Sequence, residues 1–243
     1  MRTARSQFLS RARSTREEPR QRTVIATDFE VIHVGCIGYV EGVALQRRLV
    51  TERRSDARPD TIVLAEHPAT YTIGRSGSRG HILIDDAELA RLGITVIETD
   101  RGGDVTYHGP GQIVAYPIID LRQRGGDAHA YLRALENGIV HLLAKYGVCA
   151  ERDDLHTGVW LGHAKIASIG VKISSGITSH GVALNVATDP EHWAGILACG
   201  IEGRTVTNLQ EHYHGSLDLN LLTERMVTHL RMSFVRTVPR TVA

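Results

Sequence analysis

The sequence predicts an α+β fold in which a mixed β-sheet is flanked by helices. Strand-like apolar runs follow one another without a helix between every pair, which argues against a doubly wound parallel sheet. Two β-rich runs, residues 165–173 and 177–187, are joined by Ser174-Ser175-Gly176, a short turn typical of a hairpin. A long segment with apolar residues at helical spacing follows Asp127. Strands and helices therefore both contribute, without regular alternation.

The first half of the chain contains several strand-like runs and one helical segment. Residues 30–35 (EVIHVG) predict a short strand, and residues 61–65, 94–98 and 112–120 predict three more. Residues 39–54 predict a helix with one buried face, because their apolar side chains recur at helical spacing. Those side chains are Tyr39, Val43, Leu45, Leu49 and Val50.

The second half contains the clearest helix signal. Asp127 can cap the amino end of a helix, and Gly147 can end it. Its apolar stripe consists of Tyr131, Leu132, Leu135, Ile139, Leu142, Leu143 and Tyr146. A short helix is expected to begin at Asp189-Pro190 and to end near residue 198, and a last helix spans about residues 218–232.

Composition and charge narrow the class of protein. The 243 residues carry a formal net charge of +1, and 42% of them are apolar. This balance gives no general attraction to nucleic acid or to an anionic membrane, so we expect neither as a partner. The three cysteines form an odd set without metal-ligand spacing, which argues against a disulfide framework and favours a reducing, cytoplasmic location.

The amino-terminal segment differs from the rest of the chain. Residues 1–22 contain seven Arg and two acidic residues. We interpret residues 1–27 as a basic, disordered extension and residues 28–243 as a single catalytic domain. A transit peptide for the mitochondrial matrix is the alternative, although Glu17 and Glu18 argue against it.

Residues 100–112 (DRGGDVTYHGPGQ) are the densest candidate for a ligand site. Their glycine content predicts neither an ordinary strand nor a helix, and it permits close approach of the backbone to a ligand. Backbone amides, with Arg101 and His108, are suited to hold a carbonyl, carboxylate or phosphate group. The alternative is a loop whose glycines only form turns.

Isolated cysteines, histidines and aromatic residues carry less information. Cys36 and Cys149 are expected to be small buried side chains. No metal site is expected, because the histidines lack zinc-ligand spacing, and four of them are expected at the surface: His156, His163, His212 and His214. His108 and His180 are favoured as pocket residues. Trp193 and Leu197 are expected in the core.

Five separate motifs occur in order along the chain. They are EHPATYTIG (residues 66–74), RGGDVTYHGPGQIVAYPI (101–118), KIASIG (165–170), TSHGVALN (178–185) and ACGI (198–201). Together they resemble the lipoyl(octanoyl) transferases, also called octanoyl-acyl carrier protein:protein N-octanoyltransferases. The resemblance covers roughly residues 30–212 and implies the fold shared by biotin and lipoate protein ligases.

The resemblance also implies an activity and the residues that perform it. An octanoyl group would pass from octanoyl-acyl carrier protein, through a thioester on Cys199, to a lysine of a lipoyl domain, as the first step of endogenous lipoate biosynthesis. Lys165 matches the lysine beside that cysteine. The acceptors would be lipoyl domains of 2-oxoacid dehydrogenases and the glycine-cleavage carrier protein, with no cofactor. The residues that match substrate-binding segments are Arg101, Gly102, Gly103, Asp104, Val105, Thr106, Tyr107, His108, Ser168, Ile169, Gly170, Gly181, Val182 and Ala183.

The chemistry of the residues agrees with these roles. A free thiol has a pKa of about 8.5, so a nucleophilic cysteine needs stabilisation of its thiolate. If Cys199 directly follows a helix over residues 190–198, the negative end of that helix would raise its pKa. The ammonium group of Lys165 would offset this effect. The expected scheme is ping-pong, through an acyl-enzyme.

Three other functions stay open at this point. An ATP-dependent lipoate or biotin ligase of the same fold would activate a free acid and would not need Cys199. An amidotransferase between lipoyl domains would also use a cysteine, and an inactive module would only bind lipoyl domains. Arg75, Arg79 and Arg101 are candidate contacts for the acidic carrier protein.

Overall fold

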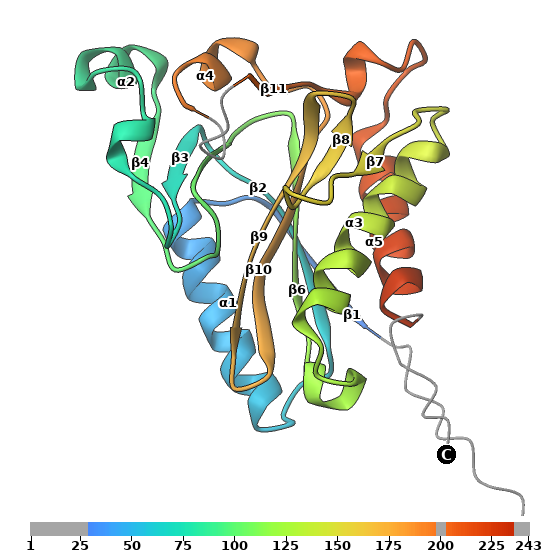
Figure 1. Ribbon diagram of the computed structural model, residues 1–243. Helices are drawn as coiled ribbons and strands as arrows, with labels where there is room; N and C mark the ends of the chain where they lie inside the picture. The colour runs from blue at the N-terminus through green and yellow to red at the C-terminus, as the bar shows by residue number, and fades with distance from the viewer. Residues whose placement is uncertain (1–28, 198–202, 236–243) are drawn as a thin grey trace, which may run out of the picture.

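The computed structural model describes residues 29–197 and 203–235. Within these residues, eight strands form one large mixed sheet and three strands form a small second sheet. Helix α1 (Tyr39–Arg54) covers one face of the large sheet, and helices α3 (Ala128–Ala144) and α5 (Leu219–Val235) cover the other face (Figure 1). The sequence prediction of a mixed sheet flanked by helices is therefore confirmed.

The large sheet has the order β1-β2-β6-β10-β9-β8-β7, and β11 pairs with β9 outside this path. The pairs β1–β2 and β9–β11 are parallel and the other pairs are antiparallel. The strands are β1 (Glu30–Cys36), β2 (Thr61–Glu66), β6 (Gln112–Ile118), β7 (Glu151–Arg152), β8 (Val159–Leu161), β9 (Ala164–Ser174), β10 (Ile177–Asn185) and β11 (Thr205–Val206).

The small sheet has the order β4-β3-β5 and lies beside α1 at the edge of the molecule (Figure 1). Its strands are β3 (Thr70–Ile73), β4 (Thr95–Glu98) and β5 (Val105–His108). Two short helices, α2 (Asp86–Leu92) and α4 (Pro190–Ala194), lie near it, and the 3-10 turns are η1 (Arg79–His81), η2 (Leu121–Arg124) and η4 (Leu209–Glu211). A small apolar cluster that includes Tyr71, Tyr107 and Trp193 holds this part together.

The main core lies between the large sheet and the pair α3 and α5. Asp127 caps α3, because its carboxylate accepts hydrogen bonds from the backbone N–H groups of His129 and Ala130. The predicted apolar stripe of α3 faces inward, and Leu135, Ile139 and Leu142 are fully buried there. Burial of such stripes, and not intrinsic helix propensity, supplies most of the stability of a helix in a folded protein.

Several sequence predictions are confirmed in detail. The helix at residues 39–54 has the predicted bounds, and the predicted hairpin is formed by β9 and β10. Ser175 and Gly176 of its turn both have positive φ angles, of 51° and 81°. Trp193 is buried as expected.

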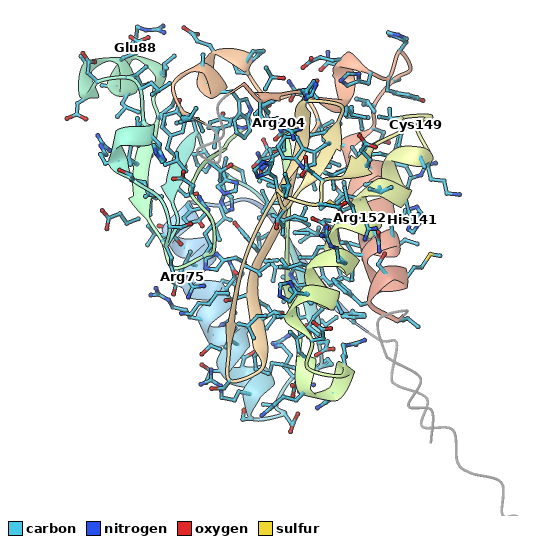
Figure 2. The ribbon with its side chains drawn as sticks, viewed as in Figure 1. Arg75, Glu88, His141, Cys149, Arg152 and Arg204 are labelled. Atoms are coloured by element: carbon cyan, nitrogen blue, oxygen red, sulfur yellow. The ribbon has the colours of Figure 1, made fainter. Side chains whose placement is uncertain are left out.

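Other predictions are wrong, each for a local reason. Residues 105–108 do form a strand, because the glycines around them shape the flanking turns and leave these four residues free to pair with β3. The short helix ends at Ala194, where Gly195 is its C-cap, and not near residue 198. Cys36 and Cys149 are exposed, because one ends an edge strand and the other follows α3 at the surface (Figure 2).

The buried face of α1 is also more polar than predicted. Gln46 and Arg53 are buried, whereas Val43, Leu45 and Val50 are only half-buried. Arg53 donates a hydrogen bond of 2.8 Å to the buried carboxylate of Asp60. A buried charge is tolerated there because it is paired.

Five further elements, β3, α2, β7, β8 and β11, were not predicted at all. Residues 1–27, expected to be an extension, lie outside the described residues, as does Cys199. Among the described residues, no helix is both long and apolar enough to cross a membrane.

Candidate active site

A cavity lies where the amino end of α1, the segment before β5 and the hairpin β9–β10 meet. It contains about 460 Å³ of empty space, its open mouth included. Twelve of the fourteen residues that the sequence assigned to substrate binding line it. They are Arg101, Gly103, Asp104, Val105, Thr106, His108, Ser168, Ile169, Gly170, Gly181, Val182 and Ala183. Segments far apart in sequence are thus brought together around one hollow.

The other two predicted residues do not line the cavity. Tyr107 points to the opposite side of β5, where its hydroxyl group lies 2.7 Å from Nδ1 of His192. This is the alternation of a strand, which turns Thr106 and His108 one way and Tyr107 the other. Gly102 instead donates a backbone hydrogen bond to the carbonyl group of Val171.

Three lining residues outside the predicted set are Tyr39, Val114 and Tyr116. The alternation of the strand that begins at Gln112 was a usable signal for Val114 and Tyr116, because residues 112, 114 and 116 face the same way. Tyr39, at the start of α1, had no comparable signal. His180 also lines the cavity, in keeping with the pocket role favoured from the sequence.

Arg101 holds the wall of the cavity in place. Its guanidinium group donates hydrogen bonds of 2.6 Å to the backbone carbonyl groups of Thr72 and Asp104. It is only 6% exposed, so it is not a surface contact for a carrier protein. Arg75 and Arg79 are exposed, and Arg75 extends outward beside α1 in Figure 2. Arg101 is therefore an anchor of the segment before β5.

Two paired glycines make room between the strands and this segment. Gly170 and Gly181 lie opposite each other in the β9–β10 register. A Cβ atom on Gly170 would lie 2.8 Å from the carbonyl oxygen of Gly102, and one on Gly181 would lie 2.2 Å from that of Ala115. Any larger residue at these two positions would push the walls apart.

A chain of buried aromatic rings forms another wall. Tyr39 stacks on His108 with ring centroids 5.4 Å apart, and His67 contacts the edge of His108 at 5.7 Å. His67 Nδ1 lies 2.7 Å from the carbonyl oxygen of Ile37, so this nitrogen carries the proton. Its Nε2 then accepts the hydrogen bond from the Tyr116 hydroxyl group, at 2.7 Å. The rings are thereby fixed in orientation.

His108 is held as a neutral imidazole. Gln112 donates from Nε2 to the Tyr107 carbonyl group and to Asn185, which leaves its Oε1 to accept from His108 Nδ1 at 2.7 Å. Burial, together with the neighbouring His67, lowers the pKa of His108 well below its ordinary value. His108 therefore contributes a hydrogen-bond acceptor at Nε2, not a positive charge.

A second histidine lies in an ionic cluster at one end of the cavity. The carboxylate group of Asp100 lies 2.6 Å from Nζ of Lys172 and 2.8 Å from Nε2 of His180. Burial alone would raise the pKa of Asp100, but these two hydrogen bonds outweigh it and lower the pKa to about 2. Burial lowers the pKa of His180. Neutral His180 thus donates from Nε2 to an ionised carboxylate.

Lys165 is the second residue of β9 and is 4% exposed. Its ammonium nitrogen lies 4.6 Å from the centroid of a Trp160 ring, and the guanidinium carbon of Arg204 lies 4.7 Å from the same residue's ring. Figure 2 shows Arg204 at the end of the β9–β10 hairpin where β9 begins. A Cβ atom on Gly158 would lie 3.2 Å from Cε of Lys165, so this glycine leaves room for the lysine side chain.

Described residues on either side of Cys199 in the sequence are anchored by backbone hydrogen bonds. Leu197 donates a backbone hydrogen bond to the carbonyl group of His81. Val206, seven residues after Cys199, pairs with Lys165 in the parallel β9–β11 ladder. Gly195, Ile196 and Leu197 follow the end of α4, so the expected direct succession from helix to Cys199 is wrong.

Comparisons with known proteins identify the family to which a chain with this fold belongs. The family model described as "Lipoyl protein ligase A/B catalytic domain" matches residues 38–231. The chain therefore belongs to the lipoyl protein ligase A/B catalytic domain family.

Two relatives and one solved structure show more specifically which proteins this chain is similar to. A protein of Chloroflexus aggregans named "Octanoyltransferase" is 45% identical over 203 residues, which cover 82% of this chain and 92% of that protein. "Octanoyltransferase LIP2, mitochondrial" of Arabidopsis thaliana is 41% identical over 208 residues, 85% of this chain and 88% of the relative. A solved structure titled "Crystal structure of lipoate-protein ligase A bound with ATP" superposes with a TM-score of 0.69. That superposition covers 86% of this chain and 93% of the other at 15% identity, so it shows a shared fold.

Proposed function

We propose that this protein is an octanoyltransferase that loads octanoyl groups onto a lysine of lipoyl domains in lipoate biosynthesis. The observation that carries the proposal is the identity of 45% and 41% with relatives named octanoyltransferase, over more than four fifths of the chain. Three of the five motifs, residues 101–118, 165–170 and 178–185, contribute residues to the lining of one cavity, which supports the same function.

The cavity is suited to an acyl chain. Apolar side chains make up much of its lining, namely Val105, Val114, Ile169, Val182 and Ala183. Burial of a methylene group stabilises binding by about 0.8 kcal/mol. The six methylene groups and the terminal methyl group of an octanoyl chain would contribute roughly 5–6 kcal/mol on this scale, which offsets part of the entropy lost on binding.

The first half-reaction forms an acyl-enzyme. The Cys199 thiolate attacks the carbonyl carbon of octanoyl-acyl carrier protein, and a new carbon–sulfur bond forms. The carbon–sulfur bond to the carrier then breaks, and the carrier thiolate takes a proton from the Lys165 ammonium group. An ammonium group beside a thiol favours the thiolate, which is the form that attacks.

The second half-reaction reverses the proton movement. The acceptor lysine attacks the Cys199 thioester as a free amine and gives its proton to Lys165, which is neutral after the first step. The amide bond forms, the Cys199 thiolate leaves, and Lys165 again carries the ammonium proton. Each proton is returned within one cycle. The scheme contains no step that uses a nucleotide or a metal ion.

The backbone pairing of Lys165 supports this assignment. Lys165 is buried and pairs with a strand that begins six residues after Cys199 in the sequence. A lysine placed on a solvated strand would instead be exposed.

The partners follow from the same proposal. The acceptors are lipoyl domains, including those of 2-oxoacid dehydrogenases and the glycine-cleavage carrier protein. The donor is octanoyl-acyl carrier protein. The cytoplasmic location stays a prediction, and the Arabidopsis thaliana relative carries the word mitochondrial in its name.

A transfer assay tests the function. Purified protein is mixed with a lipoyl domain and octanoyl-acyl carrier protein, without ATP, and the mass of the domain is measured. We expect one octanoyl group on one lysine. Modification only with free octanoate and ATP would identify a ligase instead, and binding of the domain without any modification would identify an inactive module.

A further inference from the structure

His180 lies between two hollows of the protein. On one side is the acyl cavity described above, and on the other is a groove between α1 and the hairpin β9–β10, with about 710 Å³ of empty space including its open side. Both hollows are lined by His180. The lining of the groove also includes Val43, Gln46, Val50, Asp100 and Lys172.

The order of residues along the hairpin gives the direction of the cavity. Lys165 lies at the beginning of β9, residues 168–170 line the cavity, and Lys172 and Ser174 line the groove. His180 is paired with Val171. At about 3.3 Å per residue, the backbone position of His180 is roughly 20 Å along the strand from that of Lys165. His180 thus stands at the end of the cavity away from the proposed reacting groups.

The histidine is held firmly in this place. Its backbone N–H donates to Oε1 of Gln46 at 2.7 Å, and its Nε2 donates to Asp100 at 2.8 Å. Asp100 is in turn paired with Lys172. His180 has a φ angle of 55°, a conformation that a side chain with a Cβ atom rarely adopts. Such strain persists only where the surroundings impose it, often at a functional site.

The histidine also presents a polar barrier to an apolar chain. Among the described residues, neither Nδ1 of His180 nor Nε2 of Gln46 has a hydrogen-bond partner, and both atoms are buried. An acyl chain that grew past this point would have to displace the ring and bury methylene groups against these unpaired atoms. That arrangement is unfavourable for a hydrocarbon.

We infer that His180, fixed by Asp100 and Lys172, closes the far end of the acyl cavity and limits the length of the acyl chain that the enzyme transfers. The inference rests on the proposed acyltransferase function, and it assigns the chain-length limit to one side chain. Without the imidazole ring, the acyl cavity and the α1–hairpin groove would join into one longer channel. The distal methylene groups of a longer acyl chain would then extend past the position of the ring, along the apolar side chains of Val43 and Val50 in the groove.

The variant His180→Gly tests the inference directly. Glycine accepts a φ angle of 55° without strain, so this change removes the ring without forcing the backbone to move. Rates of transfer to a lipoyl domain are measured with octanoyl-, decanoyl- and dodecanoyl-acyl carrier protein. We expect the ratio of dodecanoyl to octanoyl transfer to rise on the order of tenfold over wild type.

Two other variants distinguish an effect of the His180 side chain on chain length from a general effect on the fold. Ser175→Gly is the matched control, because Ser175 also has a positive φ angle, of 51°, but lies in the exposed hairpin turn. Its chain-length ratio should equal that of wild type. Lys172→Gln weakens the support of Asp100 and should raise the ratio by less than His180→Gly does. This second route to the same opening remains informative if His180→Gly does not fold.

Each outcome has one meaning. If wild type transfers octanoyl groups and both His180→Gly and Lys172→Gln keep the wild-type ratio, the inference is overturned and the proposed function stands. An equal rise in Ser175→Gly would also overturn it, because the effect would then come from the hairpin backbone. If wild type transfers no acyl group of any length, both the function and the inference fail.

Discussion

The two faces of the large sheet differ in the polarity of the side chains that they bury. The face under α3 and α5 is a continuous apolar core in which Leu135, Ile139 and Leu230 are completely buried. The face toward α1 and the small sheet instead buries Gln46, His67, His108 and other polar groups around an open cavity. Both faces bury apolar side chains, since Leu49 of α1 packs with Val63 and Ile118 in a further apolar cluster. The α1 face differs in that it also encloses the cavity, so we expect the chemistry of the domain on that side.

Buried side-chain atoms without a hydrogen-bond partner occur on both faces of the described structure. Those of Gln46 and His180 lie on the cavity side, whereas those of Tyr131 in α3 and Arg231 in α5 lie on the other side. The positive φ angle of His180 lies on the cavity side. Such strain persists only where the surrounding structure imposes it.

The largest expected effect is on catalysis alone. Lys165→Ala should lower kcat by roughly 100- to 10,000-fold, because a positioned acid–base group is lost. The loss is measured as the rate of octanoyl transfer to a lipoyl domain, beside the thermal midpoint. The control is Lys145→Ala at the exposed end of α3, which should keep full activity. A Lys165→Ala variant with wild-type turnover would contradict the assignment.

The opposite face should show the converse behaviour. Ile139→Ala removes a fully buried side chain of α3 and should lower the free energy of unfolding by about 2–5 kcal/mol. Urea denaturation gives the change in stability, and kcat below the transition should stay near that of wild type. His141→Ala, on the exposed side of the same helix, serves as the control (Figure 2). A large fall in kcat without a fall in stability would contradict the different roles assigned to the two faces.

Arg101 tests whether the cavity wall needs its anchor. Lysine at this position keeps the charge but cannot reproduce the paired hydrogen bonds from Nε and Nη2 to the Thr72 hydroxyl group, since it lacks the planar fork of arginine. Arg101→Lys should lower kcat/KM for the octanoyl donor roughly tenfold, through a misplaced wall. Steady-state kinetics measure this, with Arg48→Lys on the exposed side of α1 as the control. Equal kinetics for both variants would show that the wall holds without the anchor.

The smallest expected effect is on the acid side of the stability profile. The pKa of Asp100 is about 2 in the folded protein and 3.8 in its ordinary state. The ionised carboxylate therefore stabilises the fold at pH values above 3.8, and this contribution is lost as the pH falls toward 2. Asp100→Asn should lose less stability than wild type between pH 5 and pH 2, as measured by thermal melts. Asp86→Asn, on an exposed side chain, should follow wild type.

Much of this structure could be predicted from the sequence, because some structural signals are local. The Asp127 cap, the stripe of α3 and the turn at Ser175-Gly176 each depend on neighbouring residues only, and all three were predicted correctly. Strand β5 was missed because its pairing with β3 depends on residues more than thirty positions away, while its own glycine-rich flanks argued for a loop.

The candidate site could likewise be predicted only in part from the sequence. Ordered motifs identified most of the residues that line the cavity, but they gave no direction for each side chain, so Tyr107 was placed wrongly. The polar burial of Gln46 in α1 could not be foreseen, because its partner His180 is more than a hundred positions away. The pairing of Asp100 with Lys172 and His180 likewise exists only in three dimensions.

The most direct test of the proposed mechanism is intact-mass spectrometry of the protein after mixing with octanoyl-acyl carrier protein, without ATP, beside a Cys199→Ala variant. We predict one octanoyl adduct on wild type that hydroxylamine removes, and none on Cys199→Ala. An unmodified wild type that nevertheless octanoylates a lipoyl domain, or an equal adduct on Cys199→Ala, would contradict the acyl-enzyme on Cys199.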